Sequence, residues 1–218
     1  MYAEPSYWRD LAQLGGWNRA AFGWDIAVTG DLACIWLNHR LPGDIYRLGA
    51  CLTFKGCKTE SQRRVVEAIL NALPDAVGAG DASGLGTTEC ANLEVLYYGR
   101  FVGVKFNVQT KLALYTAAQG VYEARRQELP VDYPEISADV AAMKKASSAS
   151  AKLIFSATRN ELLPDSHCDL MTANTLAIYA GETIDAGPCR MEAVAEDKDP
   201  YGGGSWSDSR YPDHSDDI

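Results

Sequence analysis

The chain has 218 residues and a mass of 23.7 kDa, and its 47% of hydrophobic residues suits one hydrophobic core. Its six cysteines contain no CxxC pair, which favours reduced thiols over a disulfide framework or a zinc site. Apolar runs stay below the roughly 18 residues that a membrane helix needs, and the N-terminus lacks a signal-peptide pattern, so we expect neither a membrane span nor export. The net charge of −9 does not exclude a nucleic-acid partner, because residues 182–218 carry ten acidic and three basic residues, whereas residues 1–181 carry 19 and 17.

The two ends of the chain differ in composition from its middle. Residues 1–18 carry apolar side chains at helical spacing from Trp8 to Trp17, which predicts a short N-terminal helix. Residues 182–218 are acidic and rich in glycine and serine, without a periodic apolar pattern, and we interpret them as a C-terminal extension. Residues 19–181 contain no internal repeat, so we expect them to form one domain.

The middle of the chain opens with three predicted strands. Residues 20–28 and 32–38 flank a turn, residues 45–54 form a third extended run, and together they indicate an antiparallel meander. Helices and strands alternate after the meander, and we expect helices at 59–72, 87–98, 109–127, 134–146 and 166–179 and strands at 76–80, 101–106 and 152–155. This order predicts an α/β fold, a mixed sheet of antiparallel and parallel strands flanked by helices on both faces.

Three aspartates stand in otherwise apolar segments, and the topology predicts that they meet at one edge of the sheet. Asp25 lies in the first strand, Asp81 follows the strand at 76–80, and Asp169 lies at the start of the last helix. A buried carboxylate needs a cation or a hydrogen-bond donor, and carboxylates from distant elements can hold two divalent cations about 4 Å apart. The pattern therefore indicates a metal site with hard oxygen ligands.

Other roles remain open for these residues. Asp25 fits a strand-edge residue that is hydrogen-bonded to a turn, Asp165 fits a helix cap, and His167 fits a surface histidine. Nucleotide binding is a further alternative, because residues 80–86 form a Gly-x-x-x-Gly-x-Gly loop after a strand and resemble the loop of short-chain dehydrogenases. However, no tyrosine after this loop has a lysine four residues later, and an aspartate inside the loop would repel phosphate.

The sequence contains three motifs that resemble those of the nuclease domain of phage large terminase subunits, especially the Mu-like branch. The first is a strand with Gly-x-Asp that ends at Asp25 and precedes a turn and a second strand. The second is Asp-Ala-Ser-Gly-Leu-Gly at 81–86, and the third is His-Cys-Asp at 167–169, which opens an alanine-rich helix. The three aspartates are 56 and 88 residues apart, as is typical of that family, and the resemblance covers residues 20–181.

The resemblance implies a fold similar to RNase H and RuvC and a metal-dependent endonuclease that cuts concatemeric double-stranded phage DNA with little sequence specificity. It implies two divalent cations, Mg²⁺ or Mn²⁺, one to activate water and one to stabilise the 3′-oxygen leaving group. Asp25, Asp81 and Asp169 would be the catalytic metal ligands, with Asp165 and His167 as further candidates. Many family members carry an aspartate directly before the last acid, where this chain has a cysteine, so the third ligand stays open between Asp165 and Asp169.

The resemblance also implies DNA contacts and protein partners. Phosphate contacts would come from Lys111, which matches a family lysine at the start of the corresponding helix, and from Lys144 and Lys152. The expected partners are an N-terminal ATPase domain of the same protein, bordered by residues 1–18, the portal and the small terminase subunit, in the host cytoplasm at the procapsid portal. Two alternatives stay open: another RNase H-like nuclease, such as a junction resolvase or recombinase, and a catalytically idle module of this fold that binds DNA or protein.

Overall fold

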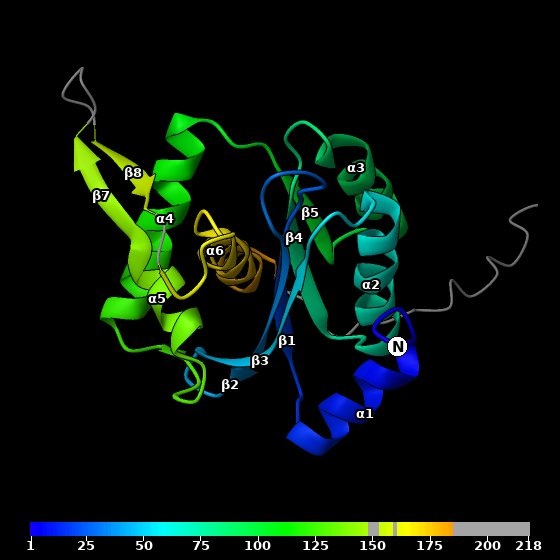
Figure 1. Cartoon of the computed structure of the whole chain (residues 1–218). Helices are drawn as coiled ribbons and strands as arrows, with labels where there is room; N and C mark the ends of the chain where they lie inside the picture. Colours follow the sequence, from blue (N-terminus) through cyan, green and yellow to red (C-terminus); the bar gives the residue numbers. More distant parts are fainter. Residues whose placement is uncertain (148–152, 159–160, 185–218) are drawn as a thin grey trace, which may run out of the picture.

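A six-stranded mixed sheet lies at the centre of the structure (Figure 1). The structure is a computed structural model that describes residues 1–147, 153–158 and 161–184. The strands, in their order across the sheet, are β5 (Phe101–Val104), β4 (Ala76–Asp81), β1 (Ala20–Asp25), β2 (Ala33–Leu41), β3 (Ile45–Phe54) and β6 (Gln127–Glu128). Strands β1, β2 and β3 form an antiparallel meander, and β4 and β5 run parallel to β1. The predicted fold class is confirmed.

Helices cover both faces of this sheet (Figure 1). They are α1 (Pro5–Gly15), α2 (Thr59–Ala72), α3 (Gly86–Leu96), α4 (Val108–Glu123), α5 (Pro134–Ala142) and α6 (Asp169–Thr183). Helices α1, α2 and α3 lie on one face, and α6 lies on the other, with α4 and α5 outside it. No helix among the described residues has the length and the apolar character that a bilayer crossing requires.

Strand β1 has helices on both sides, and its sequence reflects this position. Phe22 and Trp24 are fully buried on the side of α2, in a cluster that also contains Ile69. The side facing α6 carries Ala21 and Gly23, because successive residues of a strand point to opposite faces. An alanine Cβ at Gly23 would overlap the carbonyl oxygen of Ala173, so the glycine lets the backbones of α6 and β1 approach closely.

The predicted helix at 134–146 is wrong over its last four residues. Helix α5 ends at Ala142, and the chain continues directly into strand β7 (Met143–Ser147), which pairs antiparallel with β8 (Leu153–Ala157) as a separate two-stranded sheet. Residues 141–146 have good helix formers, but the pairing with β8 overrides this local preference. The two short strands project beside α4 (Figure 1).

The remaining predicted elements are present with shifts at their ends. The helix predicted at 109–127 is shorter, because α4 ends at Glu123 and Gln127 lies in β6. The strand predicted at 45–54 and the helix predicted at 59–72 have the observed bounds. The last helix starts at Asp169 and not at residue 166, and the short strand β6 is absent from the sequence-based prediction. A two-residue strand carries no periodic pattern, so its pairing with β3 depends on tertiary structure alone.

Candidate functional site

Asp25 and Asp81 lie at the same end of two neighbouring parallel strands. They are the last residues of β1 and β4, and the residues before them, Trp24 and Gly80, are register partners. Neighbouring strands are about 4.8 Å apart, and in-register residues of parallel strands point to the same face. The two carboxylates therefore leave the sheet side by side, on the face that α6 covers.

Asp169 approaches the same place from helix α6. It is the first residue of that helix and is only 7% exposed. Its Oδ2 accepts hydrogen bonds from the backbone N–H groups of Leu32 and His167, each at 3.2 Å. The carboxylate is therefore tied to the loop between β1 and β2. Burial raises the pKa of Asp169, and these two hydrogen bonds lower it in part.

Asp25 lies close enough to each of the other two acids for their charges to act on its carboxyl. Burial raises the pKa of its carboxyl well above the usual range. The charges of Asp169 and then Asp81 raise this pKa further, as expected for like charges at short range. Strand ends and a helix start thus bring together the three aspartates that the sequence singles out.

The loop after β4 and a lysine of α4 border this acid group. Ser83 donates its backbone N–H to Asp81 Oδ1 at 2.8 Å, and its hydroxyl accepts the N–H of Phe106 at 2.9 Å. The Lys111 ammonium lies 5.2 Å from the centre of the Phe106 ring. Burial raises the pKa of Asp81, and the charge of Lys111 lowers the pKa of both Asp81 and Asp25. A positive charge on α4 therefore faces the acids.

A fourth acid, Asp31, joins the group and is absent from the sequence-based prediction. Its Oδ1 lies 2.9 Å from His167 Nδ1, and its charge raises the pKa of both Asp25 and Asp169. In the sequence Asp31 follows Thr29 and Gly30, which is the pattern of an ordinary turn residue. Only the folded loop between β1 and β2 brings it to the site.

Of the other predicted site residues, Asp165 and Lys144 lie apart from the acids, and Lys152 lies outside the described residues. Asp165 is exposed, and its Oδ2 is paired with Lys55 Nζ at 2.7 Å. Lys144 is exposed on β7, and Lys152 lies outside the described residues. Of the two acids considered for the third ligand, Asp169 is the one among the electrostatic neighbours of Asp25.

The donor set fits a hard divalent cation in its chemistry. Its members are carboxylate oxygens from separate elements, burial disfavours their negative charges, and at Asp25 the charges of the other two acids add to this effect. A cation among them would offset both effects. Within the described part of the chain, no three histidine, cysteine or acidic side chains are arranged closely enough to hold a metal ion as they stand. The side chains would therefore have to turn toward a common centre.

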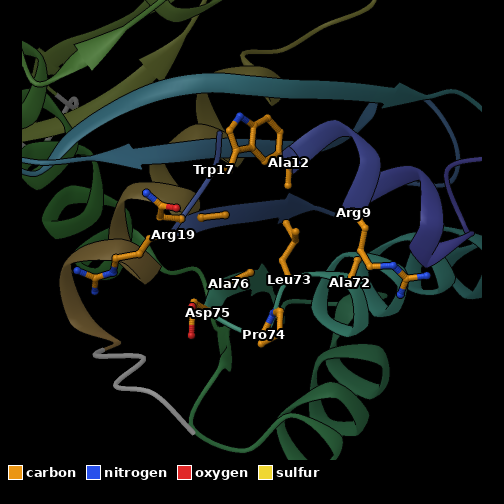
Figure 2. Close-up of a pocket in the computed structure, with 11 residues that line it drawn as sticks. Arg9, Ala12, Trp17, Arg19, Ala72, Leu73, Pro74, Asp75 and Ala76 are labelled. Atoms are coloured by element: carbon orange, nitrogen blue, oxygen red, sulfur yellow. The ribbon is translucent and has the colours of Figure 1, made fainter. Parts of the chain in front are cut away.

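A pocket of about 210 Å³ lies at the opposite end of the same strands (Figure 2). Ala20 and Ala76, the first residues of β1 and β4, line it, together with Arg9 and Trp17. In Figure 2, Leu73 lies at its centre, where the turn between α2 and β4 approaches α1. This pocket is separated from the acids by the full length of the strands and is not part of their site.

Comparison with solved structures identifies the fold. The magnesium-bound large terminase nuclease of thermophilic phage G20c has 15% sequence identity over 74% of this chain and 80% of its own, with a TM-score of 0.61. The large terminase nuclease domain of Thermus phage P74-26 has 14% identity over 73% of this chain and 77% of its own, with a TM-score of 0.57. A mutant nuclease domain of the large terminase subunit gp2 of bacterial virus Sf6, with manganese, has 13% identity over 82% and 98%, with a TM-score of 0.50.

These likenesses show that the chain has the fold of a large terminase nuclease domain, as its motifs indicate. The G20c nuclease is also known with bound cobalt and with bound zinc. No protein-family model matches the sequence, and no curated protein matches it.

Proposed function

We propose that this chain is the DNA-cutting domain of a phage packaging terminase, a metal-dependent endonuclease that acts on double-stranded DNA with little sequence specificity. The observation that supports it most is the meeting of Asp25, Asp81 and Asp169 at one end of β1 and β4. Similar folds belong to nucleases that bind magnesium or manganese. Fold and acid group are independent observations that favour the same activity.

The acids would act as the ligands of two divalent cations. Such a pair activates a water molecule for attack on the phosphate and stabilises the leaving 3′-oxygen. Asp25 and Asp81 are suited to share both ions, because their side chains leave adjacent strands on one face. Asp169 would complete the set through Oδ1, since Oδ2 already accepts two backbone N–H groups. Asp31 contacts His167 at the edge of the acid group and is a further candidate ligand.

DNA would approach the acid group past Lys111, whose charge already faces Asp25 and Asp81. The exposed Lys144 and Lys145 on β7 offer further phosphate contacts. Other basic side chains are already in ion pairs: Lys55, Arg63, Arg64 and Arg126. These are weaker candidates, because an acidic partner would have to be given up.

The domain boundaries and partners belong to the same proposal. Residues 19–181 would form the nuclease domain, residues 1–18 would border a linker to an N-terminal ATPase domain, and residues 182–218 would be an acidic extension. The portal and the small terminase subunit would be its partners at the procapsid in the host cytoplasm. Helix α1 packs on α2 through the fully buried Trp8. Any linker would therefore join the nuclease domain at a helix that is packed on it.

The test is cleavage of supercoiled plasmid by the parent, by Asp81→Asn and by Asp75→Asn, each with Mg²⁺, with Mn²⁺ and with EDTA. Asp75 is a matched control, because it is exposed and lies just before β4, at the end opposite Asp81. We expect cutting with either metal by the parent and by Asp75→Asn, and loss of cutting by Asp81→Asn and in EDTA. Cutting that persists in Asp81→Asn would refute the proposed site.

The same assay distinguishes the alternatives when the substrate is varied. A packaging nuclease is expected to cut linear and supercoiled duplexes alike, because its contacts are mainly to phosphates. A strong preference for a four-way junction would instead indicate a resolvase. No cutting with either metal, together with a melting temperature that Mn²⁺ does not change, would indicate an idle module, because a ligand of the folded state must stabilise it.

A further inference from the structure

The first turn of α6 is capped by a residue from another helix. The residue at the N-cap, Cys168, has a left-handed backbone (φ 66) and its side chain makes no capping hydrogen bond. In its place Asp139 of α5 accepts the backbone N–H of Met171 on Oδ2 at 3.1 Å. Asp139 is 0% exposed.

A buried carboxylate at this place has a physical reason. The first N–H groups of a helix have no partner within the helix, and the helix dipole favours a negative charge there. Asp139 therefore satisfies a donor of α6 and is itself held in place by it. Because the Asp139 side chain is enclosed, water cannot replace either partner in this contact. The contact therefore fixes α5 against the start of α6.

Ser166 links this contact to the acid group. Its hydroxyl accepts the backbone N–H of Asp169 at 3.0 Å, and its side chain lies close enough to the Asp139 carboxyl to lower the pKa of that carboxyl. Asp139 thus holds the N–H of Met171 directly, and it adjoins the serine that holds the N–H of Asp169.

We propose that Asp139 is a positioning residue for metal binding: it holds the first turn of α6 so that the carboxylate of Asp169 faces Asp25 and Asp81. The inference rests on the proposed function in one respect, that Asp169 is a metal ligand. Residues that orient metal ligands typically change metal affinity about 10- to 100-fold when they are removed. Asp139 itself would not touch the metal or the DNA.

The experiment measures Mn²⁺ affinity by calorimetry on the whole chain, beside plasmid cutting and thermal melting. Asp139→Ala removes the acceptor, whereas Asp139→Asn keeps an acceptor oxygen for the N–H of Met171. Val66→Ala is the matched control for lost stability, because Val66 is fully buried on α2, on the other face of the sheet. Should Asp139→Ala fail to fold, Ser166→Ala removes the hydroxyl beside Asp139 that accepts the N–H of Asp169.

We expect Asp139→Ala to weaken Mn²⁺ binding about 10-fold or more, Ser166→Ala to weaken it several-fold, and Asp139→Asn and Val66→Ala to stay near the parent value. Asp139→Ala, or Ser166→Ala in its place, that melts earlier with unchanged Mn²⁺ affinity would overturn the inference and leave a purely structural cap. The two proposals fail differently. Mn²⁺ binding without DNA cutting by the parent overturns the proposed function alone, while a parent that binds no Mn²⁺ overturns both.

Discussion

Gly23→Ala tests whether the close approach of α6 and β1 builds the site. The added Cβ would overlap the carbonyl oxygen of Ala173 and would lie 2.6 Å from the backbone nitrogen of Ala177. Both neighbours are backbone atoms of a buried helix, so no flexible side chain can move aside. We therefore expect α6 to move away from β1, with a loss of about 1–3 kcal/mol in the free energy of unfolding, as for other overpacked cores.

The same shift would carry Asp169 away from Asp25, because Asp169 is the first residue of α6. A misplacement of about 1 Å can reduce catalysis about 100-fold, so plasmid cutting should fall far more than stability. The matched control is Gly120→Ala, since Gly120 lies in helix α4 with no atom within 4 Å of an added Cβ. That variant should gain about 0.5–1 kcal/mol in urea unfolding and keep its activity. A Gly23→Ala protein with the stability and cutting rate of the parent would refute the described packing of α6.

Three further changes have expected outcomes of their own. Asp25→Asn removes a charge that burial and three neighbouring acids disfavour, so in EDTA we expect the free energy of unfolding to rise by on the order of 1 kcal/mol. Urea titration measures this change, and a loss of stability would contradict the crowding of the acids. Mn²⁺ at 100 times its dissociation constant should stabilise the parent by about 2.7 kcal/mol, and thermal melts of Asp81→Asn should show little of this gain. Burial and the charge of Arg47 lower the pKa of His39. The contribution of the neutral His39 to stability is therefore complete above the unfolded-state pKa of about 6.5, and it is lost as the pH falls below that value. In urea titrations His39→Gln should lose less stability at low pH than the parent, and an identical pH profile of the two proteins would contradict this expectation.

The strand ends of the site follow from the sequence, because the pattern that predicts them is local. Asp25 and Asp81 each close an apolar run, and apolar runs in this order predict adjacent parallel strands whose ends coincide. Asp169 is predicted for the same reason, as the acid at the start of an apolar helix. These residues could be placed together without knowing a single tertiary contact.

Asp31 and Asp139 could not be found in this way. Asp31 lies in a turn and Asp139 inside an amphipathic helix, where acids are ordinary, and each takes its role from a segment more than 30 residues away in the chain. Strand β7 illustrates the same limit, because residues 143–146 favour a helix locally and become a strand only through β8. Tertiary contacts decide what local pattern leaves open.

The site combines two strand ends with one helix start, and this combination has an electrostatic consequence. A third carboxylate beside Asp25 and Asp81 is repelled by both, but a helix start offers it a favourable dipole of about 0.3–1 kcal/mol. Asp169 also receives two backbone N–H groups, one of them from Leu32 in a distant loop. A strand end lacks this dipole. Since Asp139 accepts another N–H of the same turn, that of Met171, the helix start serves two acids at once: Asp139 fixes the turn, and the turn holds Asp169 beside Asp25.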